Sequence, residues 1–143
     1  MTWLAARRAT VLIPSGPDHD PDRMHLHIVL TDPRADKNGM EKVIVVSVSS
    51  VPSTQIYDSS CTLFTGEHPF ISRDSFVTYQ FAAVVDPNLL EQEVAQKRFV
   101  AKSIMDEKVF RFVIEGLRES PYTTPRILRL FDEWCDTADQ QQA

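Results

Sequence analysis

The chain has 143 residues, of which 43% are hydrophobic and 24% charged, and this size and balance suit a single compact domain over residues 1–143. Its formal net charge of -5 argues against the extended basic surface with which proteins grip duplex DNA. The sequence contains no run of about 18 apolar residues, and Arg7 and Arg8 interrupt the N-terminal segment where a signal peptide needs an apolar core. We therefore expect a cytoplasmic protein that does not enter a membrane.

Short strands are predicted through the first 86 residues. The segment MHLHIVLTD alternates Leu26, Ile28 and Leu30 with other side chains, which is the period-two pattern of a strand with one face toward a core. Clusters of Ser, Gly, Pro, Asp and Asn separate the apolar runs and indicate turns. The predicted strands are 10–14, 24–32, 41–51, 61–64 and 75–85.

The strands 24–32 and 41–51 are predicted to pair as a hairpin around DPRADKNG, with facing residues whose numbers sum to about 73. His25 then lies near Val48 and diagonally close to Ser47 and Ser49. The even-numbered apolar residues of both strands share the core face. The opposite face collects the polar groups, namely His25, His27, Ser47 and Ser49.

Helices are predicted after the strands. A short helix is expected over 89–97, Ser103 is expected to cap the next one, and a last amphipathic helix begins at about Pro125. Five short strands with little helix between them favour a small barrel over a parallel sheet. The predicted class is mainly β with C-terminal helices (α+β), as a small antiparallel barrel over about 9–86 and a helical region over about 88–136.

The polar face of the hairpin is a candidate site. Imidazole moves protons near neutral pH, and a hydroxyl binds a phosphate oxygen or a ribose, so His25 with Ser49 has the right chemistry. The alternative is a solvated sheet face without a function. His68 also allows two interpretations. It is either a group of the same site or a turn residue that is hydrogen-bonded to the backbone, because Pro69 holds it in an extended conformation.

No cofactor is expected. The four glycines are too sparse for a phosphate-binding loop, and the two histidines of HLH have no obvious third ligand with which to hold a metal ion.

The order of the segments VLIP, MHLHIVLTD, VSVSS, RDSFVTYQFAAVV and DEKVFRFVIEGLRES resembles the PemK/MazF-type toxins of toxin-antitoxin modules. These are small SH3-like barrels related to Kid and CcdB, and the resemblance covers most of residues 9–118. It implies a metal-independent endoribonuclease that cleaves single-stranded RNA, pairs as a homodimer and is bound by an antitoxin protein.

The resemblance also implies site residues. His25 and Leu26 stand where the family has an Arg-Pro pair, which is a departure, and Ser49 stands where the family has Thr or Ser. Histidine is a poorer permanent cation than arginine but a better proton carrier, so Arg23 is expected to supply positive charge or His25 to act as the base with a second acid. The catalytic candidates are His25, Ser49 and His68, and the substrate-binding candidates are Arg23, Ser47, Arg73 and Ser75.

Two other functions stay open on the sequence alone. One is a non-catalytic barrel that binds a protein partner, either a gyrase-inhibitor-like protein or one that binds an antitoxin. The other is a barrel in which the change from Arg to His25 has abolished catalysis and left only RNA or antitoxin binding.

Overall fold

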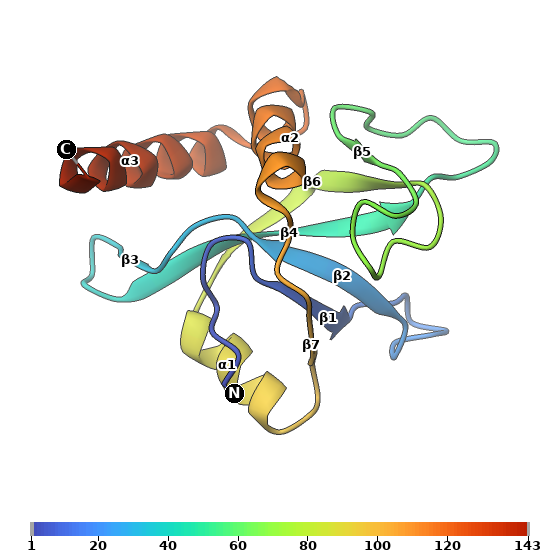
Figure 1. Ribbon diagram of the computed structural model, residues 1–143, viewed down its shortest axis with the longest axis horizontal. Helices are drawn as coiled ribbons and strands as arrows, with labels where there is room; N and C mark the ends of the chain where they lie inside the picture. Colours follow the sequence, from blue (N-terminus) through green and yellow to red (C-terminus); the bar gives the residue numbers. More distant parts are fainter. Residues whose placement is uncertain (1, 143) are drawn as a thin grey trace.

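The computed structural model describes the backbone of residues 2–142 and the side chains of residues 2–135 (Figure 1). The strands are β1 (Thr10–Pro14), β2 (Met24–Val29), β3 (Arg34–Ala35), β4 (Glu41–Ser50), β5 (Thr62–Leu63), β6 (Ser75–Val85) and β7 (Val100–Lys102). The helices are α1 (Pro87–Ala95), α2 (Glu107–Glu119) and α3 (Pro125–Gln142).

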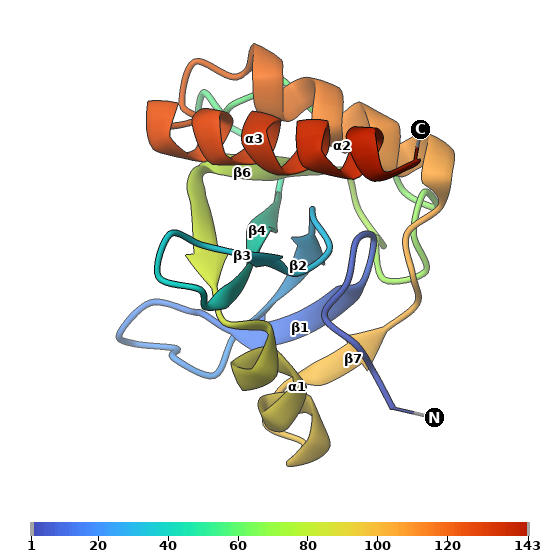
Figure 2. The same cartoon turned by 90° about the vertical axis from the view of Figure 1, so that its left-hand side faces the viewer.

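The strands form one curled antiparallel sheet in the order β5-β6-β4-β2-β1-β7, with β3 paired to β4. Because β5 and β7 are the two ends of this order, the sheet is a half-barrel. Helices α2 and α3 lie together on one side of it, and α1 lies at the opposite end near the N-terminus (Figures 1 and 2). The pairing of β4 with β6 shifts between Val45 and Ser47, and a shift of this kind bends a sheet. The predicted class, mainly β with C-terminal helices, is confirmed.

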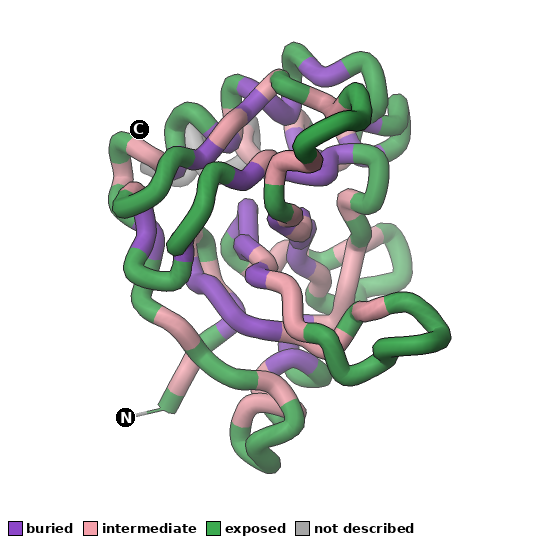
Figure 3. Tube along the Cα trace, turned by 90° about the vertical axis from the view of Figure 1, so that its right-hand side faces the viewer, coloured by how far each residue is buried: buried purple, intermediate pink, exposed green. Residues whose placement is uncertain are grey.

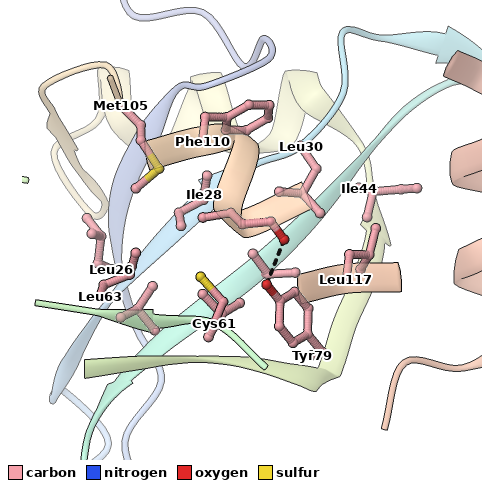
Figure 4. Packing of buried hydrophobic residues seen from close by; sticks show 14 of the residues in the cluster. Leu26, Ile28, Leu30, Ile44, Cys61, Leu63, Tyr79, Met105, Phe110 and Leu117 are labelled. Carbon is pink, nitrogen blue, oxygen red and sulfur yellow. Dashed lines mark hydrogen bonds between the residues drawn. The ribbon is translucent and has the colours of Figure 1, made fainter. Parts of the chain in front are cut away.

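The main apolar core lies between the sheet and the two C-terminal helices. Leu26 and Ile28 of β2 and Ile44 of β4 pack there with Phe110 and Leu117 of α2 (Figure 4). The predicted apolar stripe of the last helix faces the same core, through the buried residues Ile127, Phe131 and Trp134. Buried residues are concentrated in β1, β2, β4 and the first half of β6 and recur along α2 and the described part of α3, whereas the loop 15–23 is largely exposed (Figure 3).

A smaller apolar cluster covers the other face of the sheet. Val43 and Val45 of β4 pack there with Leu90 of α1 and with Ala5 and Ala9 of the N-terminal segment. The first half of β4 is thus buried on both faces, which explains why its sequence VIVV has no polar alternation.

Helix α2 packs tightly against β6 at Gly116. The Tyr79 hydroxyl donates a 2.6 Å hydrogen bond to the Val113 carbonyl, and a Cβ atom on Gly116 would lie only 2.2 Å from the same hydroxyl oxygen and 2.8 Å from Cβ of Cys61. Residue 116 is therefore a glycine because Tyr79 of β6 and the neighbouring Cys61 leave no room for a side chain on α2.

The register of the β2–β4 pair differs from the prediction by one residue. His27 lies opposite Ser47 and Ile28 opposite Val46, so the facing numbers sum to 74, and His25 is not set opposite Val48. The chain leaves the ladder after Leu30, where the Thr31 hydroxyl accepts the Ile44 N–H at 3.2 Å in place of a backbone carbonyl. The division of the two strands into a core face and a polar face is as predicted.

The second predicted helix has a different cap. Ser103 lies in the connection between β7 and α2, and the carboxylate of Asp106 accepts the N–H groups of Lys108 and Val109 at the start of α2. Asp106 also sits directly before the first helical residue, which is where a capping side chain has to be.

The first helix begins two residues earlier than predicted, at Pro87, with Asp86 as its cap. The two short strands β3 and β7 were not predicted, because segments of two and three residues show no period.

In the part of the chain that the structure describes, no helix is both long and apolar enough to cross a membrane.

Candidate functional site

A cavity of about 430 Å³ opens where β2 and β4 separate. The two strands pair only through His27–Val29 and Val45–Ser47, so the start of β2 and the end of β4 are not paired with each other. The loop 70–73, which precedes β6, lies beside this gap and lines the cavity. Five of the seven predicted site residues line it, namely Arg23, His25, Ser49, Arg73 and Ser75.

His25 is oriented by a hydroxyl on the neighbouring strand connection. Its Nδ1 lies 2.8 Å from Oγ of Ser15, and the Ser15 hydroxyl donates to the carbonyl of Ile13. When the Ser15 hydroxyl donates to Ile13 it accepts from Nδ1–H of His25, and in this tautomer the lone pair of the imidazole is on Nε2.

His25 is mostly uncharged near neutral pH. Burial and, to a lesser extent, the positive charge of Arg23 lower the pKa of the His25 imidazole below its ordinary value. Nε2 has no hydrogen-bond partner within residues 2–135. In the tautomer protonated on Nδ1, a neutral imidazole whose Nε2 has no partner accepts a proton from a substrate hydroxyl.

The cavity is electropositive although the chain as a whole is acidic. Arg23 and Arg73 are exposed, and neither forms an ion pair with a side chain within residues 2–135. Among the side chains that the structure describes, no Asp or Glu lines this cavity. The carboxylate of Asp74, next to Arg73, instead accepts the backbone N–H of Thr65 at 3.3 Å. Two unpaired guanidinium groups without a competing carboxylate are suited to hold an anion such as phosphate.

The two serines that line the cavity differ in whether the hydroxyl group already has a hydrogen-bond partner. The Ser75 hydroxyl is buried and donates to the Arg73 carbonyl at 2.9 Å, so it helps to set the backbone that carries Arg73. The Ser49 hydroxyl is half-buried and has no partner among the described residues, which leaves it available to a ligand.

His68 is not among the residues that line the cavity. Its side chain is 3% exposed, its Nδ1 accepts the N–H of Phe70 at 3.0 Å, and its Nε2 lies 2.7 Å from the carbonyl of Ser103 and 3.2 Å from the hydroxyl of Thr10. Both ring nitrogens are therefore engaged. The imidazole ties the loop that carries Phe70 and Arg73 to the sheet and its β7 end, which is the structural alternative raised by the sequence.

Ser47 is also placed outside the cavity. Its hydroxyl forms a short hydrogen bond with the Thr78 hydroxyl of β6, and it lies opposite His27 on the polar face of the sheet. The His27 Nδ1 contacts the His25 carbonyl at 2.9 Å, and burial is the main cause that lowers the pKa of His27.

Sequence reasoning missed Ser15 and Phe70. The pairing of β1 with β2 places Ile13 opposite His25, so the hydroxyl two residues after Ile13 was within reach of the imidazole once that hairpin was recognised. Phe70 lines the cavity, and its ring lies 5.6 Å from the ammonium group of Lys102. No local sequence pattern predicts this contact, because the two residues belong to distant segments.

Within residues 2–135, no three or more His, Cys, Asp or Glu side chains gather closely enough to hold a metal ion. Comparison of the chain with protein-family models, with curated proteins and with solved structures found no match.

Proposed function

We propose that this protein is a metal-independent endoribonuclease that cleaves single-stranded RNA in the cavity between β2 and β4. One observation carries the proposal: a neutral histidine with a free Nε2 shares a cavity with two unpaired arginines, and no described carboxylate lines that cavity. This combination provides a base and an anion site together, which is what phosphodiester cleavage requires.

In the proposed reaction, Nε2 of His25 takes the proton of a ribose 2′-hydroxyl. The 2′ oxygen then attacks the adjacent phosphorus and forms a P–O bond, while the bond to the 5′ oxygen of the next nucleotide breaks. The leaving 5′ oxygen takes a proton from solvent, and the products are a 2′,3′-cyclic phosphate end and a 5′-hydroxyl end. Arg23 and Arg73 stabilise the negative charge that develops on the phosphate oxygens, and the Ser49 hydroxyl donates to one of them.

Single-stranded RNA fits this cavity better than a duplex. A duplex presents two phosphate backbones and is bound through an extended basic surface, whereas the chain carries a net charge of -5 and lines this cavity with only two arginines. A flexible single strand can place one phosphate in a small cavity without the extended basic surface that a duplex needs.

The resemblance to PemK/MazF-type toxins extends this proposal to a biological setting. We infer that the protein is the toxin of a toxin-antitoxin module, acts in the cytoplasm as a homodimer and is bound by an antitoxin protein.

The direct test incubates the purified protein with a mixed-sequence single-stranded RNA in the presence of EDTA, at pH values from about 5 to 9. We expect cleavage to 2′,3′-cyclic phosphate ends, and His25→Ala is expected to lower kcat/KM by about 100-fold or more because the base is lost. Ser49→Ala is expected to have a smaller effect. His19→Ala, in the exposed loop between β1 and β2, is the matched control and should cleave like the wild type. RNA that stays intact across this pH range would overturn the proposal.

Expression in a bacterium separates catalysis from partner binding. Growth arrest that His25→Ala and Ser49→Ala both relieve, in variants that still fold, supports cleavage. Arrest that survives both substitutions indicates that the protein acts by binding a partner through another surface.

A further inference from the structure

A second cavity, of about 220 Å³, lies along β6 and is lined by Phe76, Thr78 and Gln80 of that strand. Phe76 of β6 lines it and lies directly opposite Ser49, which lines the first cavity. Residues that face each other on antiparallel strands have their Cβ atoms about 5 Å apart, so the linings of the two cavities meet at Ser49 and Phe76.

The second cavity has aromatic walls. The rings of Tyr57 and Phe76 are 5.0 Å apart between centroids and are tilted by 46°. Tyr122, in the connection between α2 and α3, adds a third ring that is 53% exposed. The side chains of Gln55 and Gln80 line the same cavity, are exposed and have no hydrogen-bond partner among the described residues. Aromatic faces beside free amide groups suit a flat ligand with polar edges.

The charge of the second cavity is opposite to that of the first. Its described lining contains no Lys, Arg or His, and it contains the carboxylate of Asp58. The Ser120 hydroxyl donates to this carboxylate at 2.6 Å, and Ser60 donates to it through its N–H and its hydroxyl. Partial burial favours the protonated acid, but these hydrogen bonds outweigh it and lower the pKa of Asp58, so the group is charged at neutral pH. A carboxylate repels phosphate and accepts an amino hydrogen.

We propose that the second cavity binds a nucleobase of the RNA strand whose phosphate lies in the first cavity, with the base stacked on the exposed ring of Tyr122 and its polar edge toward Gln55, Gln80 and Asp58. This inference rests on the proposed function, because it assigns the neighbouring cavity to the phosphate and the ribose. Stacking accounts for the aromatic walls, and the amides and the carboxylate account for the polar ones.

The test measures binding separately from cleavage. The probe is a fluorescein-labelled single-stranded DNA oligomer, which lacks the 2′-hydroxyl and is not cut, and its dissociation constant is read from fluorescence anisotropy. Tyr122→Ala is expected to weaken binding by about fivefold or more, the usual effect of losing one stacked base contact. Phe112→Ala is the matched control, because this phenylalanine of α2 is 50% exposed and lines a different cavity. We expect it to bind like the wild type.

An abasic oligomer of the same length distinguishes the base from the backbone. Wild type and Tyr122→Ala are expected to bind it equally, because it has no base to stack. The inference is overturned if the wild type does not bind the DNA oligomer, if Tyr122→Ala binds it as tightly as the wild type does, or if Tyr122→Ala loses affinity for the abasic oligomer to the same extent.

The outcome for the proposed function is read from RNA cleavage. Cleavage that depends on His25, together with unchanged oligomer binding by Tyr122→Ala, would support the nuclease function and refute the base site. Binding that depends on Tyr122, without RNA cleavage at any pH, would support the base site and refute the nuclease function.

Discussion

Replacing His68 with alanine tests whether this histidine holds the loop beside the cavity or takes part in the reaction. The substitution removes the contact between Nε2 and the Ser103 carbonyl at 2.7 Å and leaves the Phe70 N–H without the Nδ1 acceptor at 3.0 Å. A hydrogen bond contributes about 1 kcal/mol to stability, and a buried polar group left without a partner costs about 1–3 kcal/mol. Because the side chain is 3% exposed, the lost ring also leaves a void, and we expect the free energy of unfolding to fall by about 2–4 kcal/mol.

Thermal unfolding followed by circular dichroism measures this loss. The entropy of unfolding is about 2.1 cal/mol/K per residue, which for this chain is about 0.3 kcal/mol/K, so the Tm is expected to fall by about 7–13 °C. His25→Ala is the matched control, because its imidazole is half-buried at the edge of the cavity. It should lower the Tm by less than about 3 °C while lowering kcat/KM for cleavage by about 100-fold or more.

The pair of variants gives opposite patterns if the two histidines have different roles. Below its Tm, His68→Ala is expected to keep a measurable kcat and to show a raised KM, because the loop that carries Arg73 is held less firmly. A Tm within about 2 °C of the wild type would refute the structural role, since the loss of two hydrogen bonds predicts a larger shift. Loss of activity at an unchanged Tm would instead make His68 a reacting group.

Three further predictions concern the fold. Gly116→Ala should destabilise the protein by about 1–3 kcal/mol in urea unfolding although alanine is the better helix former, because the new Cβ meets the Tyr79 hydroxyl; a stabilised variant would contradict this packing. Asp106→Ala should cost about 1 kcal/mol through the lost cap of α2, whereas Ser103→Ala should be nearly neutral; the reverse order would restore Ser103 as the cap. Burial lowers the pKa of His27 below its ordinary 6.5, so the unfolded chain takes up more protons than the folded one as the pH falls, and the free energy of unfolding should decrease between about pH 7 and 5.5. This slope should be smaller in His27→Asn, and urea unfolding at several pH values that shows the same slope in both proteins would count against a buried neutral imidazole.

The positions of the longer strands and the faces of β2 and β4 could be predicted from the sequence. Each depends on a local pattern: the alternation through Leu26 and Ile28 determines which side chains point to the core, whatever the partner strand. The register could not be predicted to within one residue. It depends on how the chain leaves the ladder at Thr31, whose hydroxyl replaces a backbone acceptor for Ile44.

The roles of His25 and His68 could not be distinguished from the sequence. Both are histidines in β-rich segments, and the sequence offered each as a catalytic group. Their roles separate only in three dimensions, because Ser15 engages one nitrogen of His25 and leaves the other free, whereas Phe70 and Ser103 engage both nitrogens of His68.

The sequence by itself determined the mainly β class, the amphipathic helices and the polar face that carries His25 and Ser49, because these follow from the period of neighbouring residues along one segment. Only the tertiary structure decided that Arg23 and Arg73, fifty positions apart, share one cavity and that described carboxylates are absent from its lining. The physical reason is that charge and hydrogen bonding at a site depend on distances between segments, which the divergence of β2 from β4 and the anchoring of the loop by His68 establish only when the chain is folded.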